Sequence, residues 1–83
     1  MKYVVVCYAV HEKRIASYDT FDNEDAAYTF LEADAKNTYE EEYDNADDED
    51  RKHIDFTIND NGTAHLSSYD GEYVWTWEVI KIR

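Results

Sequence analysis

The sequence predicts an α+β domain in which one amphipathic helix covers one face of a mostly antiparallel five-stranded sheet. Hydrophobic residues make up 43% of the 83 residues and include eight Tyr, three Phe and two Trp, so the chain can fold despite a net charge of −12. Segments of β-strand character flank a single segment with helical spacing, which gives the order β-β-α-β-β-β. A chain of this length has room for one hydrophobic core, so we treat residues 1–83 as a single domain.

Two strands are expected before the helix. Residues 3–10 (YVVVCYAV) are β-branched and aromatic and predict a strand that is buried on both faces, near the centre of the sheet. Residues 11–14 are polar and predict a turn. Residues 15–21 (IASYDTF) alternate more weakly and predict a second strand that forms a hairpin with the first.

The helix is expected to begin after Phe21, with Asp22 or Asn23 as its N-cap. Acids at positions 24 and 25 would face the positive end of the helix dipole. The spacing of three and four residues then continues along one apolar stripe. Its members are Ala27, Phe30, Leu31, Ala35, Thr38 and, as a further candidate, Tyr39. The pattern places the end of the helix between Tyr43 and Asp48.

Three strands are expected after the helix. Residues 53–60 (HIDFTIND) alternate, with Ile54, Phe56 and Ile58 on one face. Asp60-Asn61-Gly62 predicts a type I′ hairpin turn into a return strand over residues 63–69, and Asp70-Gly71 predicts a second turn of the same kind.

The last strand, residues 73–82 (YVWTWEVIKI), changes parity near its end. Trp75, Trp77 and Val79 share one face, whereas Ile80 and Ile82 belong to the other. A bulge, or burial of both faces near the end, would explain the change. We expect at least one tryptophan in the core and tyrosine or tryptophan on the half-open face of the sheet.

The sequence offers little for catalysis, and we expect no enzyme, no cofactor and no metal. Cys7 is the only thiol and lies within an apolar strand, where burial would make it unreactive. Two glycines, both in predicted turns, cannot form a phosphate-binding loop. His53 and His65 could face each other across two strands and bind zinc with Asp55, but solvent-facing strand residues are the favoured interpretation.

The excess charge lies in one segment. Residues 15–50 hold 14 acids and one base, Lys36, and carry −13, whereas the rest of the chain carries +1. Residues 39–50 (YEEEYDNADDED) alone contain eight acids. A charge run of this kind is often only a solvated surface, but its acids also look poorly placed for stability. Pairs such as Glu40–Asp44 and Asp44–Asp48 would repel if one helix continued through them, and residues 47–50 would face the negative end of its dipole.

The second interpretation is a surface that imitates a polyanion. As one helix, residues 22–50 would place 13 acids over about 43 Å, close to the phosphate spacing of ~3.4 Å along one DNA strand. Such a surface would bind a basic nucleic-acid-binding protein and would not bind nucleic acid or anionic membrane directly. The candidate partner-binding residues are Glu32, Asp34, Tyr39, Glu40, Glu41, Tyr43, Asp44, Asp47, Asp48, Glu49 and Asp50.

In length, acidity and α+β composition, the chain resembles the small phage-encoded DNA-mimic inhibitors. This group includes anti-CRISPR proteins, the uracil-DNA glycosylase inhibitor and anti-restriction proteins. The resemblance concerns general character, includes no shared motif, and therefore assigns no role to any single residue. It implies an inhibitor that occupies a basic nucleic-acid-binding site, with a CRISPR effector nuclease or its nucleic-acid complex as the first candidate target.

The alternative function is a protein-interaction module that uses an aromatic sheet face (Tyr73, Trp75, Trp77) or a sheet edge, with the acidic helix as solvated surface only. Either a monomer or a homodimer is compatible with the sequence. The single cysteine and the lack of a secretory or membrane-spanning pattern favour the cytoplasm, which would be the host cytoplasm for a phage protein.

Overall fold

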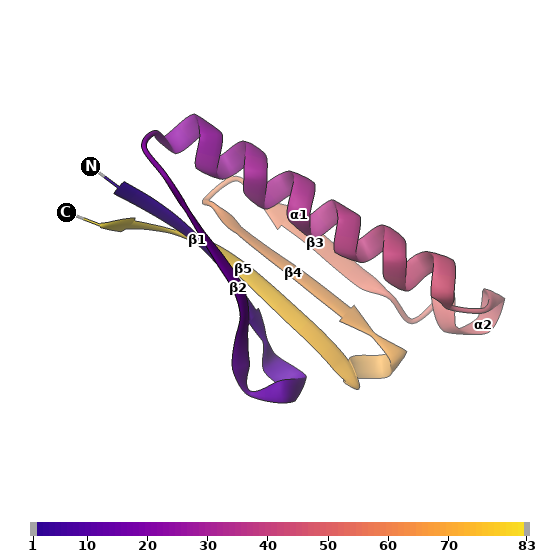
Figure 1. Cartoon of the computed structure of the whole chain (residues 1–83). Coiled ribbons are helices and arrows are strands. Elements are labelled where there is room, and N and C mark those ends of the chain that lie inside the picture. The colour runs from indigo at the N-terminus through magenta and orange to yellow at the C-terminus, as the bar shows by residue number, and fades with distance from the viewer. Residues whose placement is uncertain (1, 83) are drawn as a thin grey trace.

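The computed structural model describes residues 2–82, whose strands form one open antiparallel sheet in the order β2-β1-β5-β4-β3 (Figure 1). This arrangement confirms the predicted fold class and the order β-β-α-β-β-β. The elements are β1 (Lys2–Ala9), η1 (Val10–Glu12), β2 (Arg14–Phe21), α1 (Glu24–Asn45), α2 (Asp48–Arg51), β3 (Asp55–Asn59), β4 (Thr63–Ser68), η2 (Tyr69–Gly71) and β5 (Tyr73–Ile82).

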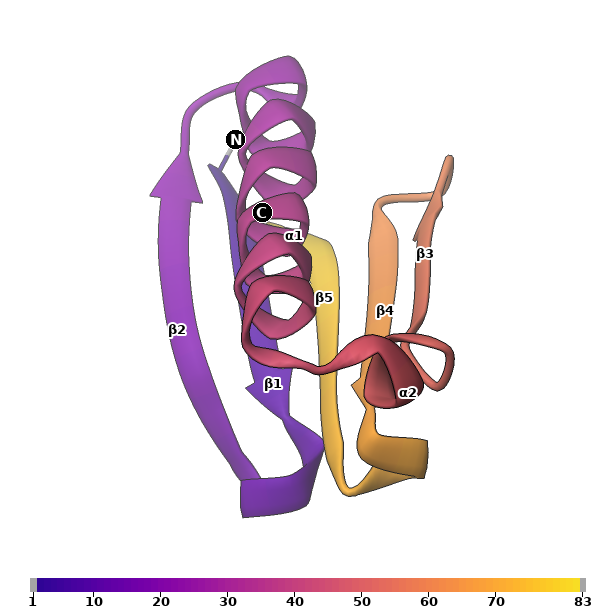
Figure 2. The ribbon, with the colours of Figure 1, turned by 90° about the vertical axis from the view of Figure 1, so that its right-hand side faces the viewer.

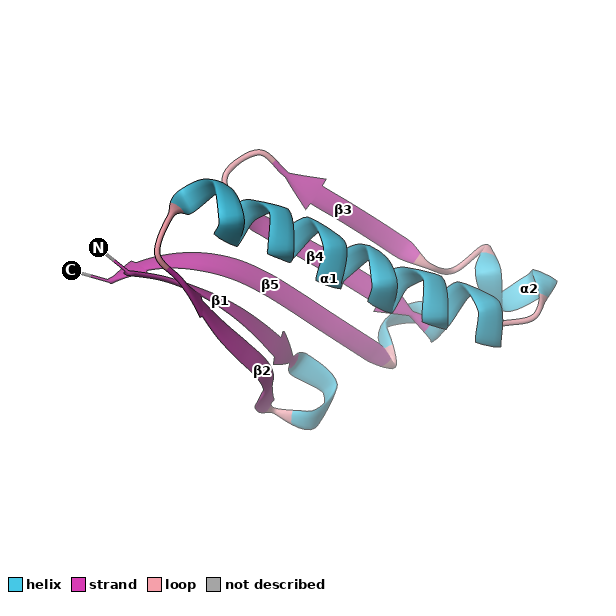
Figure 3. Ribbon diagram, turned by 45° about the horizontal axis from the view of Figure 1, so that its top comes forward, coloured by secondary structure: helices cyan, strands magenta, loops and turns pink. Residues whose placement is uncertain are grey.

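The core lies between α1 and one face of the sheet, as Figures 2 and 3 show. Small side chains on α1 let the helix approach the strands closely, and Leu31 and Trp77 fill most of the space between them at 2% and 1% exposure. The buried members of this core are Val5, Cys7, Ala27, Leu31, Ala35, Ala64, Leu66 and Trp77. No element within residues 2–82 covers the opposite face, which we call the open face.

The open face makes one prediction wrong. Strand β1 is an interior strand near the centre of the sheet, next to the central β5, but it is buried on one side only. Val5, Cys7 and Ala9 are buried beneath α1, whereas Val4 and Val6 on the opposite side are half-buried. A hydrophobic run of this length is typical of a strand between two layers, and here the second layer is missing.

Helix α1 begins at the second of the two predicted caps. The Asn23 side chain accepts a hydrogen bond from the Ala26 amide at 2.7 Å, whereas Asp22 forms an ion pair with Lys2 at 2.7 Å. The helix ends at Asn45, within the predicted window, because Ala46 leaves the helical conformation with ψ at 148°.

Both hairpin turns differ from the type I′ prediction. In the first, Gly62 has a positive φ of 80° and Asn61 does not, so Asp60–Gly62 form a three-residue loop with glycine at the left-handed position. In the second, Tyr69 and Asp70 have φ values of 51° and 56° and precede Gly71 at 92°. The left-handed backbone therefore begins one residue earlier than the Asp-Gly pair indicated.

The parity change in β5 has neither of the expected explanations. β5 pairs with β1 in continuous register from Lys2–Ile82 to Ala9–Trp75, without a bulge. The register shift of this sheet lies between β1 and β2 instead, near Cys7 and Tyr8. Ile80 and Ile82 simply lie on the open face, where they are 41% and 47% exposed.

Candidate functional site

Exposed carboxylates gather where α1 ends and α2 begins, at the far end of the helix from the chain termini (Figure 1). Six acids between positions 40 and 49 are exposed, and we call this set the acidic ridge: Glu40, Glu41, Asp44, Asp47, Asp48 and Glu49. Because Ala27, Leu31 and Ala35 turn the apolar side of α1 to the sheet, the acids of α1 at positions 40, 41 and 44 are left in solvent. The other three acids are exposed at the cap and in the first turn of α2. The junction of the two helices therefore brings six exposed carboxylates together within ten residues of the chain.

The ridge is not part of one continuous helix, which corrects the sequence-based picture. Asp47 is the N-cap of α2, and its Oδ1 accepts a hydrogen bond from the Asp50 amide at 2.9 Å. Asp48 and Glu49 lie in the first turn of α2, where carboxylates interact favourably with the free amides. The acids of residues 47–50 are therefore better placed for stability than a single long helix would allow, and α1 itself is about 33 Å long rather than 43 Å.

Arg51 joins the two helices beneath the ridge. Its Nε donates to the Tyr43 carbonyl at 2.8 Å, and its guanidinium carbon lies 4.3 Å from the centre of the Tyr43 ring. The last turn of α1 contains no base of its own, so Arg51 supplies positive charge to the negative end of that helix. Tyr43 is 41% exposed, yet one face of its ring is already occupied by Arg51.

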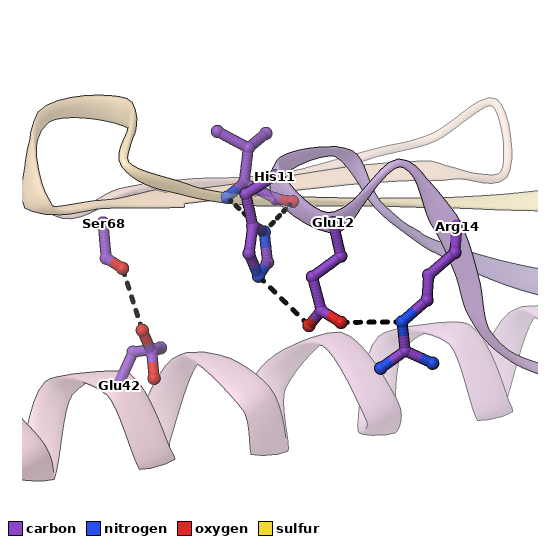
Figure 4. A network of polar contacts seen from close by, with 6 residues as sticks. His11, Glu12, Arg14, Glu42 and Ser68 are labelled. Carbon is purple, nitrogen blue, oxygen red and sulfur yellow. Dashed lines mark hydrogen bonds and ion pairs between the residues drawn. The ribbon is translucent and has the colours of Figure 1, made fainter.

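Three other side chains of the acidic segment turn inward. Asp34 Oδ2 accepts a hydrogen bond from Trp77 Nε1 at 2.9 Å. Tyr39 is half-buried and stacks on Phe56, with ring centres 4.7 Å apart and planes 10° apart. Glu42 accepts a hydrogen bond from the buried Ser68 hydroxyl at 2.8 Å (Figure 4). The structure therefore uses Asp34 and Tyr39 to hold the helix on the sheet, and neither lies on the acidic ridge.

The remaining candidates lie at the margins of the ridge. Glu32 is exposed but lies two helical turns before Glu40. Asp50 is half-buried, and partial desolvation together with the Asp47 carboxylate raises its pKa. Desolvation and the carboxylates of Asp50 and Glu42 likewise raise the pKa of Tyr69, which shows how closely α1, α2 and η2 concentrate negative charge.

Groups that could perform chemistry lie apart from one another. Burial, with a smaller contribution from Asp34, raises the pKa of the Cys7 thiol to about 11, as its strand position predicted. His53 Nδ1 lies 2.8 Å from Asp70, whereas His65 is paired with Thr57 across β3 and β4, so the two histidines do not face each other. Residues 2–82 contain no pocket and no group of three potential metal ligands.

His11 forms a contact that the sequence did not indicate. Its Nδ1 lies 3.0 Å from both the amide nitrogen and the carbonyl oxygen of Val74, and its Nε2 lies 3.5 Å from Glu12 (Figure 4). The ring also meets Tyr73 and Trp75 edge-on, with ring centres 5.2 Å and 4.9 Å away. His11 therefore ties η1 to β5, and no short-range sequence pattern could reveal a contact across 63 positions.

The aromatic face considered as an alternative interaction surface lies on the helix side of the sheet. Trp77 is 1% exposed and belongs to the core, which confirms the expectation for at least one tryptophan. Trp75 is half-buried against the core, and Tyr73 is 38% exposed at the sheet end. Of the three aromatic residues, only Trp77 is fully covered, and Tyr73 is the most exposed.

Comparisons of the chain with protein-family models, with curated proteins and with solved structures give no match. Within residues 2–82, neither helix is long and apolar enough to span a membrane.

Proposed function

We propose that the chain is a DNA-mimic inhibitor, which uses the acidic ridge to occupy a basic nucleic-acid-binding site of a DNA-processing or defence protein. The observation that carries this proposal is the exposure of six carboxylates within ten residues at the junction of α1 and α2. Along α1, Glu40, Glu41 and Asp44 cover about 6 Å of helix axis, so their mean separation of about 3 Å along the axis is comparable with the ~3.4 Å between phosphates along a DNA strand. A groove lined with Lys and Arg would meet on this ridge the same sign of charge that it meets on DNA.

The ridge is also held in place. Asp47 is fixed as the cap of α2, and Arg51 links α2 to the last turn of α1 through Tyr43. A rigid arrangement of charges loses less conformational entropy on binding than an acidic tail does, so it can compete with DNA at lower concentration. Among candidate targets, a CRISPR effector nuclease comes first because its duplex channel and PAM-reading groove are basic.

The test uses three purified targets: a Cas9-type effector with its guide RNA, a uracil-DNA glycosylase and a DNA restriction enzyme. Binding of the chain to each is measured between 0.05 and 0.5 M NaCl, with and without competing duplex DNA. We expect binding to at least one target that weakens steeply with salt and is displaced by DNA. Lack of binding to all three targets, or binding that DNA leaves unchanged, would overturn the proposal.

The variant Glu40→Gln/Glu41→Gln/Asp44→Asn removes three ridge charges and spares the Asp47 cap. Its matched control removes three exposed acids elsewhere and reaches the same net charge: Asp19→Asn, Asp60→Asn and Glu72→Gln. We expect the ridge variant to bind about a hundredfold more weakly and the control to change little, because short-range charge contacts outweigh net charge at physiological salt. Equal losses in the two variants would show that net charge alone drives association, against the proposal.

A further inference from the structure

The open face of the sheet carries large apolar side chains that no other part of residues 2–82 covers. Tyr18 is 69% exposed and lies beside Val6 of β1, while Ile15 is 56% exposed and lies beside Tyr8. On β5, Ile80 is 41% exposed and lies beside Val4. These contacts across three neighbouring strands make one apolar patch, and its exposed members are Ile15, Tyr18, Ile80 and Ile82.

The patch departs from the usual pattern of a sheet that faces water. Antiparallel sheets with one solvated face normally alternate apolar and polar residues, so that the solvated side is polar. The part of the open face that β3 and β4 form is polar, as this rule predicts, and includes Thr57 on β3 and His65 and Ser67 on β4. Thr20 of β2 and Thr76 and Glu78 of β5 also lie on the open face, beside Val4, Tyr8 and Val6. The apolar side chains are therefore concentrated on β1, at one end of β5 and at two positions of β2, with polar residues around them, and an apolar centre with a polar rim is typical of a protein–protein interface.

The open face also differs from the rest of the molecule in charge. Its strand residues include two acids, Asp55 and Glu78, and one base, Lys2. This is close to neutral in a chain whose net charge is −12. The open face would therefore attract a strongly basic partner only weakly, whereas a neutral apolar surface would complement it.

We propose that the partner of this face is a second copy of the chain, and that two chains form a homodimer by packing their open faces together. A two-fold interface buries the same patch on both subunits, as this self-complementary apolar centre requires. Two sheets packed face to face lie about 10 Å apart, with each helix roughly a further 10 Å outward. The α1 helices would then be about 30 Å apart, several Debye lengths of ~8 Å, so their charges would repel only weakly.

The area is sufficient for a reversible dimer. Five strands about 4.8 Å apart, with roughly eight residues of 3.3 Å each, give a face of about 600 Å². A standard interface buries about 800 Å² on each partner, so this dimer would lie at the smaller, weaker end of the range. It would also display an acidic ridge on each outer surface. The inference goes beyond the proposed inhibitor function and does not depend on it, because the residues concerned lie on opposite sides of the sheet.

Sedimentation equilibrium of the unmodified chain tests the dimer directly. Between 10 μM and 1 mM protein, we expect the weight-average mass to rise from 9.8 kDa toward twice that value. The rise should persist or increase in 1 M NaCl, because salt screens the remaining repulsion and strengthens apolar contact. A mass that stays at 9.8 kDa up to 1 mM, or association that disappears in 1 M NaCl, would overturn the proposal.

A pair of matched variants then locates the interface. Ile80→Thr removes an apolar contact from the open face, and Ile58→Thr changes an isoleucine of similar exposure, 37%, on the helix side of β3. Both keep a β-branched residue in a strand, and circular dichroism checks that both fold. We expect Ile80→Thr to weaken dimerisation at least about tenfold and Ile58→Thr to leave it unchanged. Dimerisation unaffected by Ile80→Thr would contradict face-to-face packing, since Ile80 lies two strands from the β2 edge and edge pairing would not involve it.

Discussion

The hydrogen bond between Trp77 and Asp34 gives a direct test of how the helix is held on the sheet. Trp77 is 1% exposed, and its Nε1 donates to Asp34 Oδ2 at 2.9 Å. Asp34→Ala would leave this donor without its partner, and an unsatisfied buried donor costs about 1–3 kcal/mol. Because Asp34 itself is half-buried, water can partly replace the carboxylate, so we expect a loss of about 1–2 kcal/mol.

The loss is measurable by urea unfolding at pH 7, followed by tryptophan fluorescence. In a domain of this size each kcal/mol lowers Tm by about 4–8 °C, so Asp34→Ala should melt about 5–15 °C below the unmodified chain. Asp34→Asn should lose less, because its amide oxygen can still accept from Trp77, although a neutral acceptor binds less strongly than a carboxylate.

The matched control is Glu32→Ala, which removes the same charge from the same helix at an exposed position. It should change the free energy of unfolding by no more than about 0.5 kcal/mol. If Asp34→Ala lost no more stability than Glu32→Ala, the bond to Trp77 would not hold the helix in solution. Asp34 would then have to be returned to the set of partner-binding candidates.

Two further predictions concern backbone strain and pH. Gly62→Ala places a Cβ at positive φ and 3.1 Å from the Tyr28 hydroxyl, whereas a Cβ at Gly71, also at positive φ, meets no atom within 4 Å. In urea unfolding we expect Gly62→Ala to lower the free energy of unfolding by about 2 kcal/mol and Gly71→Ala by about 1 kcal/mol. Equal losses would contradict the close approach between Gly62 and Tyr28. The bond from Lys2 lowers the pKa of Asp22 below its ordinary 3.8, so its stabilising contribution is present above that value and is lost as pH falls through the lowered pKa. The pKa of Asp50 is raised, so its ionisation opposes folding near neutrality and acidification relieves this. In thermal melts from pH 3 to 7, Asp22→Asn should therefore lower Tm most at pH 7, while Asp50→Asn should raise Tm at pH 7. A raised Tm for Asp22→Asn at pH 7 would refute the first assignment, and a lowered Tm for Asp50→Asn would refute the second.

The sequence predicted the elements well because their signals are local. The apolar stripe of α1, the alternation of β4 around Leu66 and the position of Cys7 in a buried strand all follow from the spacing of neighbouring residues. The end of α1 at Asn45 also fell within the predicted window. Periodicity shows which side of a helix or strand is apolar, and in an α+β domain that side usually packs into the core between the helix and the sheet.

Periodicity does not report whether a second layer exists to cover an apolar side. The hydrophobic run of β1 therefore predicted burial on two faces, and the parity change at Ile80 predicted a bulge or burial of both faces, although both patterns reflect the same uncovered face. The contacts that turn Asp34 and Tyr39 inward depend on Trp77 and Phe56, which are 43 and 17 positions away in the chain. Such partners are fixed by the strand order, and charge pattern alone cannot separate them from the exposed acids beside them.

The short helix α2 changes the reason for assigning a partner to the acidic segment. If residues 47–50 destabilised the fold, a ligand would be needed to explain why the chain contains them. Asp47 caps α2, and Asp48 and Glu49 lie in its first turn, where they pair with Arg51 and Lys52 at 3.6 Å and 3.5 Å, so these acids cost less than one long helix would imply. Arg51 also donates to the Tyr43 carbonyl at the end of α1. Geometry, and no longer destabilisation, points to a partner. Glu40, Glu41 and Asp44 project from a fixed helix, and the last turn of that helix contains no basic residue to neutralise them. A basic partner could pair with these three carboxylates without displacing a basic side chain of the same helix turn.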